Sequence, residues 1–200
     1  MGGILRRREM MIHGGTPPTP PSGDAYISAT SNVSLETPCA LPTGSTLILE
    51  GVFDVPNAAK GLTFFDFSAN KKDFRKHPSY NDYLIFRYYG NDFEIHATGI
   101  TQNVKKVELS TSSRYFLATL ADDTVVASGT APRAWANTTT ALRIYLSNYL
   151  KITKITQLDS SSNVVHELTP TTQNNQVGLL DSVTNTFYGT DDSAAYIGYF

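Results

Sequence analysis

Hydrophobic and polar residues alternate along most of this chain with a period of two. The segment from Asp92 to Ala97 (DFEIHA) shows the pattern most clearly, because every second residue in it is apolar. This spacing is typical of a β-strand with one buried face and one face in water. The 3.6-residue period of an amphipathic helix is absent from every window of about 11 residues or more. The pattern therefore predicts an all-β protein.

The expected strands follow one another at short intervals and are separated by turn residues. Residues 90–91 (GN) and 122–123 (DD) have the composition of hairpin turns, and the basic segment 68–81 is typical of a polar loop. The predicted strands are Thr46–Val55, Leu62–Phe67, Tyr83–Tyr89, Asp92–Ala97, Lys105–Leu109, Arg114–Leu120, Thr124–Ser128, Leu142–Leu146, Leu150–Leu158, Val164–Leu168, Val177–Leu180, Thr186–Tyr188 and Ala195–Phe200. About a dozen strands at this spacing favour a two-sheet antiparallel β-sandwich or jelly roll.

Residues 1–23 differ in composition from the rest of the chain. The segment 16–23 (TPPTPPSG) is rich in Pro and Gly, which favour an extended backbone and cannot build a core. The basic residues Arg6–Arg8 are not followed by the apolar run that a signal peptide needs. We therefore divide the chain into an N-terminal docking arm with its linker, residues 1–23, and a β-sandwich, residues 24–200.

Composition excludes several classes of protein. The chain has 24 Thr and 17 Ser, which suits strands and turns, and only 17% of its residues are charged. Its formal net charge is -2, from 16 Lys and Arg against 18 Asp and Glu, which excludes a strongly basic nucleic-acid coat. No apolar run approaches the ~18 residues of a membrane-spanning helix. We expect neither nucleic acid nor membrane among its partners.

Sequence motifs for catalysis do not occur in this chain. The single cysteine, Cys39, excludes an intrachain disulfide and a cysteine-based zinc site, and its TPCALP context predicts an inert thiol. Asp92, Glu94 and His96 have metal-ligand side chains on one face of a predicted strand. The alternation alone explains them as a solvated strand face. We therefore expect no enzyme activity, no cofactor and no metal ion.

The last third of the chain carries a family resemblance. The segments TALRIYLSN (140–148), KITKI (151–155), NVVHELTP (163–170) and VGLLDSVTNTFY (177–188) resemble the end of the concanavalin A-like (LamG-type) jelly-roll domain of phage and prophage structural proteins. The residues that match its closing pattern are Pro170, Gly178, Asp181, Asn185, Phe187 and Tyr188. Thr171 stands where the family often has Cys. The resemblance implies a concanavalin A-like sandwich behind an extended N-terminal arm.

The closing residues also have a purely structural explanation. Asp181 would begin a turn that Asn185 completes, because Asx side chains accept bonds from nearby backbone amides. Gly178 permits a close or positive-φ backbone, and Phe187 and Tyr188 would return the chain to the core. We therefore expect these residues to be structural and not to bind a ligand.

The resemblance further implies a place in a virus particle. We expect a bacteriophage virion structural protein, either an accessory capsid protein, a head fibre or a tail-associated component, assembled in the cytoplasm of the bacterial host. Its arm would bury apolar side chains on other virion proteins and pair its arginines with an acidic surface. The expected docking residues are Ile4, Leu5, Arg6, Arg7, Arg8, Met10 and Met11. A symmetric homo-oligomer such as a trimer would suit a virion.

Two alternative functions stay open. The first is a glycan-binding adhesin or receptor-binding module that holds a host surface glycan by aromatic stacking. Its candidate residues are Trp135, Tyr88 and Tyr89, although aromatic residues in an all-β domain also serve as core or cross-strand packing. The second is a glycoside hydrolase, which needs a pair of carboxylates. The Glu-x-Asp-x-x-Glu run of the related glucanases is absent from the sequence.

Overall fold

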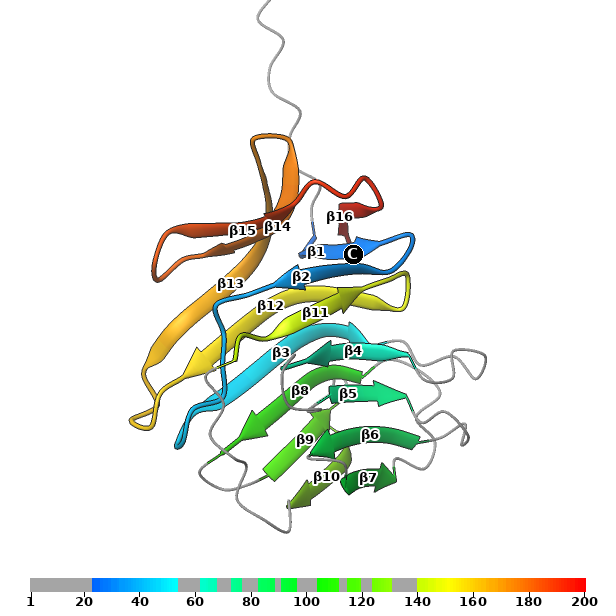
Figure 1. Cartoon of the computed structure of the whole chain (residues 1–200), viewed down its shortest axis with the longest axis vertical. Coiled ribbons are helices and arrows are strands. Elements are labelled where there is room, and N and C mark those ends of the chain that lie inside the picture. Colours follow the sequence, from blue (N-terminus) through cyan, green and yellow to red (C-terminus); the bar gives the residue numbers. More distant parts are fainter. Residues whose placement is uncertain are drawn as a thin grey trace, which may run out of the picture.

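Every secondary-structure element in the described part of the chain is a β-strand, and the strands form two antiparallel sheets (Figure 1). A computed structural model describes residues 23–53, 62–67, 73–76, 83–88, 91–96, 104–111, 115–119, 124–130 and 140–200. Side chains are described at 23–53, 62–67, 105–111, 119, 124–125 and 140–200. The predicted all-β, two-sheet antiparallel architecture is confirmed.

The larger sheet has ten strands. They are β1 (Ala25–Ala29), β3 (Thr46–Phe53), β8 (Val104–Ser110), β9 (Tyr115–Thr119), β10 (Val125–Thr130), β12 (Leu150–Leu158), β13 (Val164–Gln173), β14 (Gln176–Asp181), β15 (Thr186–Thr190) and β16 (Ala195–Tyr199). Eight of them follow in the order β10-β9-β8-β3-β12-β13-β14-β15, and β1 pairs with both β12 and β16. The first and the last described strands are therefore neighbours.

The smaller sheet has six strands, whose register separates apolar from charged rows. In order they are β2 (Val33–Glu36), β11 (Arg143–Leu146), β4 (Thr63–Asp66), β5 (Asp73–Lys76), β6 (Tyr83–Tyr88) and β7 (Asn91–His96). One row of cross-strand partners is Leu35, Ile144, Phe65, Phe74, Phe86 and Phe93. The next row is Glu36, Arg143, Asp66, Asp73, Arg87 and Asp92. The register therefore places apolar residues opposite one another in one row and charged residues opposite one another in the next.

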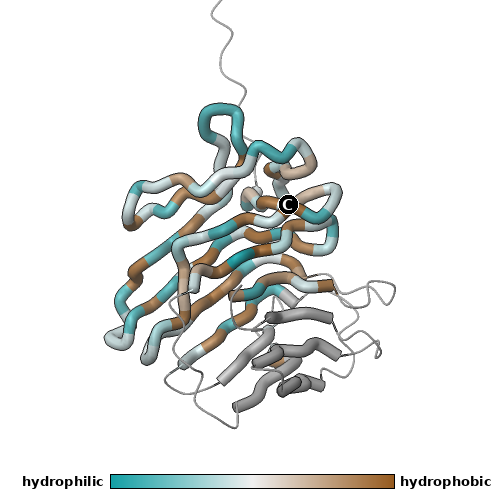
Figure 2. The backbone as a smooth tube through the Cα atoms, viewed as in Figure 1, coloured by the Kyte–Doolittle hydropathy of each residue, from teal (hydrophilic) through white to brown (hydrophobic). Residues whose placement is uncertain are grey.

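The core lies between the two sheets. Leu49 of β3 and Ile155 of β12 are fully buried from one side, and Ile144 of β11 is fully buried from the other. Phe53 of β3 meets Phe64 of β4 edge to face, with ring centroids 5.7 Å apart, and so joins the sheets. Figure 2 shows hydrophobic positions alternating with polar ones along the described strands. Each such buried side chain contributes about 1.5–3 kcal/mol of hydrophobic stabilisation.

The strand predictions were wrong or incomplete at several places. Residues 73–76, predicted as part of a polar loop, form β5, because Phe74 pairs with Phe65 and Phe86 in neighbouring strands. β1 and β2 were not predicted, since their five and four residues are too few for a recognisable period. β13 continues past Pro170 to Gln173 because pairing with β14 supports it there. Pairing with neighbouring strands, and not the pattern within one segment, decides each of these cases.

The predicted closing turn is confirmed. Asp181 is fully buried, and its Oδ1 accepts the amides of Glu167 and Val183, both at 3.1 Å. Its Oδ2 accepts the Thr184 hydroxyl at 2.8 Å and lies 2.7 Å from Nδ1 of His166. Asn185 ends the turn with a φ of 54°. A buried carboxylate with four partners fixes the hairpin between β14 and β15 onto β13.

Replacement of Asp181 should lower stability and change its dependence on pH. Burial raises the pKa of Asp181, but hydrogen bonds from His166, Thr184 and two amides outweigh burial and hold that pKa below its ordinary value of 3.8. The carboxylate therefore stabilises the fold above that value, and this stability is lost as the pH falls through the lower pKa of the folded state. We expect Asp181→Asn to lower the free energy of unfolding by about 1–3 kcal/mol near neutral pH. In this variant that free energy should also fall less steeply as the pH becomes acid.

Urea unfolding between about pH 2 and 7 measures this effect. Asp191→Asn is the matched control, because Asp191 is exposed and lies in the loop after β15. Equal unfolding curves for the two variants would show that the Asp181 hydrogen bonds do not stabilise the fold.

Candidate functional site

Most of the predicted site residues lie outside the part of the chain that the structure describes. These are Ile4, Leu5, Arg6, Arg7, Arg8, Met10, Met11, Tyr89 and Trp135. Tyr88 ends β6 and pairs in register with Asn91 of β7, and its side chain is not described. Asp92, Glu94 and His96 occupy alternate positions of β7, as the sequence predicts. The roles assigned to these residues stay predictions.

A cleft opens in the larger sheet where β12 changes its neighbour. One edge of β12 pairs with β13 from Ile155 to Leu158, whereas at Ile152 that edge pairs with β1. Beyond Leu168, β13 pairs only with β14. β1 and β13 therefore pair with the same edge of β12 at different positions and diverge from each other. The cleft lies between them.

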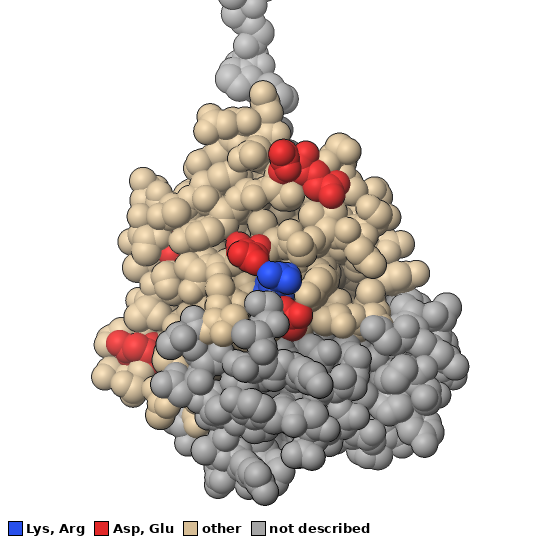
Figure 3. Space-filling view, in the orientation of Figure 1, with Lys and Arg blue, Asp and Glu red and all other residues tan. Residues whose placement is uncertain are grey.

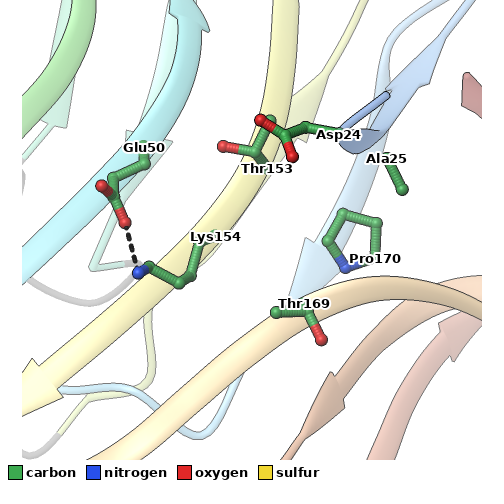
Figure 4. A pocket seen from close by; sticks show the side chains of 7 residues that line it. All are labelled: Asp24, Ala25, Glu50, Thr153, Lys154, Thr169 and Pro170. Atoms are coloured by element: carbon green, nitrogen blue, oxygen red, sulfur yellow. Dashed lines mark ion pairs between the residues drawn. The ribbon is translucent and has the colours of Figure 1, made fainter. Parts of the chain in front are cut away.

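Residues of four neighbouring segments line this cleft, whose volume is about 350 Å³. They are Asp24, Ala25, Glu50, Thr153, Lys154, Thr169 and Pro170. In Figure 4 the Glu50–Lys154 pair lies at one side, Asp24 and Thr153 at the upper edge, and Thr169 and Pro170 at the lower edge. Pro170 suits this position because a proline has no N–H and β13 has lost its β12 partner here.

A bulge in β12 and a glycine in β3 give the cleft its shape. Ile152 pairs with Gly51 and Lys154 pairs with Glu50, so Thr153 is the extra residue of the bulge. Gly51 has a φ of 154°, and a Cβ there would collide with the carbonyl oxygen of Lys151. Only glycine fits this backbone without a clash.

A second hollow of about 380 Å³ adjoins the cleft, because Asp24, Glu50 and Thr153 line both. Its other lining residues are Gly51, Val52, Lys105 and Phe200. Phe200 is 53% exposed, so its ring is accessible from this hollow.

Lys105 and Phe200 of this second hollow belong to a larger cluster of aromatic and basic side chains. The ring centroids of Tyr26 and Phe200 lie 4.8 Å apart. The Lys151 ammonium lies 4.9 Å from the ring centroid of Tyr26 and 5.4 Å from that of Phe200. The Lys105 ammonium lies 5.5 Å from the centroid of Phe200. We name Tyr26, Phe200, Lys105 and Lys151 the aromatic–lysine rim.

Opposite charges meet inside the cleft. Lys154 Nζ lies 2.9 Å from Glu50 Oε2, and the hydrogen bond to Glu50 raises the pKa of Lys154 against the opposing effect of burial. Both side chains are more than a third exposed, so the pair contributes little to stability. Its consequence is that Glu50 and Lys154 neutralise each other and hold each other in place.

The arrangement is suited to binding hydroxyl-rich ligands. Asp24 can accept hydrogen bonds from ligand hydroxyls, and Thr153 and Thr169 can both donate and accept them. The exposed ring of Phe200 offers a stacking surface, and the volume falls within the range of about 300–1,000 Å³ that small-molecule sites have. The residues that line the two hollows include no His, Cys or Ser.

A second polar group lies on the outer face of the smaller sheet, which Figure 3 views directly. Arg143 Nη2 donates to Glu36 Oε1 at 2.6 Å, and the Tyr145 hydroxyl donates to Asp66 Oδ2 at 2.7 Å. Burial, and then the hydrogen bond to Asp66, raise the pKa of Tyr145. Among the described residues, Asp66 Oδ1 is buried without a hydrogen-bond partner. Three of these residues belong to the charged register row, which stabilises the sheet across β2, β11 and β4.

The cleft was not predicted from the sequence. Glu50 and Lys154 come from the middle of two strands, while Asp24 and Phe200 come from the two ends of the described chain. No local spacing connects these residues, because the β1–β16 and β3–β12 pairings bring them together. The only sequence signal is the pair of aromatic residues that ends the chain, Tyr199 and Phe200.

Comparison with known proteins gives no family assignment. The sequence matches no protein-family model, and the search of curated proteins finds no relative. Among the residues that the structure describes, no three His, Cys, Asp or Glu side chains are grouped to hold a metal ion. Within the same residues no helix is long and apolar enough to cross a membrane. The site must therefore be interpreted from its own chemistry.

Cys39 is a buried core residue. Cys39 lies in the segment that connects β2 to β3, and its side chain is fully buried. Burial is the largest cause that raises the pKa of this thiol, to about 12. A thiol with that pKa holds almost no nucleophilic thiolate at neutral pH. The prediction of an inert thiol is confirmed in this respect.

Native protein should therefore resist thiol reagents. We expect Cys39 to react with a maleimide or an aromatic disulfide reagent only after denaturant unfolds the chain, and Cys39→Ser to abolish that signal. Reagent uptake followed with and without denaturant measures this. One equivalent of rapid labelling in native protein would contradict the buried position.

Proposed function

We propose that this protein is a structural component of a bacteriophage particle, either an accessory capsid protein, a head fibre or a tail-associated protein. The place where residues 1–23 join the sandwich supports the proposal. β1 follows this segment and pairs with β16, and the Phe200 amide donates to the Asp24 carbonyl at 3.3 Å. Four strands separate β1 from β10 (Figure 1), which corresponds to about 24 Å at 4.8 Å per strand. A module tethered at β1 would present β10 away from its anchor.

Residues 1–23 would provide that anchor. Ile4, Leu5, Met10 and Met11 would bury apolar surface on another virion protein, and the arginines Arg6–Arg8 would pair with its carboxylates. The sandwich would then carry out its function without a cofactor or a chemical step. A symmetric oligomer such as a trimer would multiply each weak anchor.

Loss of the arm should uncouple folding from assembly. We expect residues 24–200 alone, and full-length protein with Ile4→Asp and Leu5→Asp, to give native-like circular dichroism but to be missing from purified particles. Incorporation is measured by identifying the proteins in purified particles of the phage that encodes this chain. The control carries Thr16→Asp and Thr19→Asp in the linker and should be incorporated. Normal incorporation of residues 24–200 would overturn the proposal.

Glycan binding is the second candidate function, and the cleft favours it. A hydroxyl-lined cleft beside the exposed ring of Phe200 has the composition of a saccharide site. The two proposals are compatible, because a virion protein can also hold a host polysaccharide. A glycoside hydrolase is less favoured, because Lys154 already pairs with Glu50, one of the two carboxylates in the cleft.

A saccharide array separates the cleft from the aromatic site predicted from sequence. We expect full-length protein to bind at least one saccharide, and Phe200→Ala to weaken that binding about tenfold. Val183→Ala removes a side chain of similar exposure, 51%, from the closing turn and should bind normally. Loss of binding in Trp135→Ala with normal binding in Phe200→Ala would instead place the glycan at Trp135.

A further inference from the structure

The aromatic–lysine rim holds two ammonium groups that form no ion pair with another described residue. The ammonium groups of Lys105 and Lys151 both lie within 5.5 Å of the ring centroid of Phe200, and Lys151 also contacts Tyr26. Within the described residues, neither ammonium has a carboxylate at ion-pair distance, whereas Lys154 is paired with Glu50. An anion that binds beside the Phe200 ring would be attracted by both ammonium groups.

Several backbone features hold the rim in position. Tyr26 pairs in register with Gly198 of β16, and a Cβ at Gly198 would collide with the Tyr26 ring. The absence of a side chain at Gly198 therefore lets that ring lie on the neighbouring strand. Tyr196 contacts the other side of the cluster, with its ring centroid 6.3 Å from that of Tyr26. Lys151 lies on β12, the strand that pairs with both β1 and β13. The rim is thus anchored to three strands of the larger sheet.

Carboxylates lie beside the rim in both hollows. Asp24 and Glu50 line both hollows, so a ligand that occupies them must offer hydrogen-bond donors and not further negative charge. Thr153 adds a hydroxyl beside them. A ligand that satisfies both parts carries neutral hydroxyl groups on one portion and an anionic substituent on another.

We propose that the aromatic–lysine rim recognises the anionic substituent of an acidic saccharide. The inference rests on the glycan-binding function proposed above and names its ligand class. The sugar's hydroxyls hydrogen-bond to Asp24 and Thr153, its apolar face stacks on Phe200, and its anionic group lies between the ammonium groups of Lys105 and Lys151. An acidic peptide fits less well, because its closely spaced carboxylates would face Asp24 and Glu50.

The chemistry admits two sources of negative charge, a carboxylate or a sulfate ester. Titration calorimetry of full-length protein distinguishes them with three probes: oligogalacturonate for the carboxylate, sulfated dextran oligomers for the ester, and neutral dextran oligomers. We expect one or both acidic probes to bind, with affinity that falls as salt is raised. Lys105→Gln and Lys151→Gln should each weaken that binding about tenfold, because each removes one charged hydrogen-bond donor.

Two charge-matched controls test position. Lys106→Gln removes a charge from the neighbouring position of β8, and Arg143→Gln removes one from the opposite sheet. Both should bind the acidic probes normally. Equal weakening by all four variants would overturn the proposal in favour of unspecific attraction. Neutral dextran bound as tightly as the acidic probes, and insensitive to both lysine variants, would overturn the ligand class but leave glycan binding intact. Failure of every saccharide on the array would remove both.

Discussion

Strand β12 divides one of its edges between two neighbours, and the larger sheet depends on how it does so. One edge of β12 pairs with β3. The opposite edge pairs with β1 at Ile152 and with β13 from Ile155 onward. The bulge at Thr153 and the backbone of Gly51 turn the strand between these two pairings. The cleft follows from this division, because β1 and β13 cannot both pair with the same residues of β12.

The two proposed functions would act near the same end of the sandwich. Asp24 follows the linker directly and also lines both hollows. A saccharide in the cleft would therefore be held close to the anchored segment and not at the far edge formed by β10. Such a site suits attachment of the protein to a glycan-bearing surface, or cohesion within an assembly. A receptor site at the far edge formed by β10 would have to use other residues.

Local patterns were sufficient for much of the fold. Leu47 and Leu49 alternate with half-buried neighbours, as a half-buried strand requires, and the strand from Thr46 was predicted from them. The turn at Asp181 was predictable because its bonds to Val183 and Thr184 are local. β5 was not predictable from Phe74 alone, since only its partners in β4 and β6 make that segment a strand. The candidate site was not predictable, because its residues meet only through sheet pairing.

The sequence by itself determined the all-β class, most strand positions, the closing turn and the distinct composition of residues 1–23, because each depends on residues close together in the chain. Tertiary structure alone decided that Tyr26 lies on Gly198, that Glu50 meets Lys154, and that the β12 edge divides. The physical reason is that strand pairing joins distant segments through backbone hydrogen bonds that any sequence can make. Only the combined burial of both sheets selects one register, and a slip of one residue would exchange the core face for the solvent face.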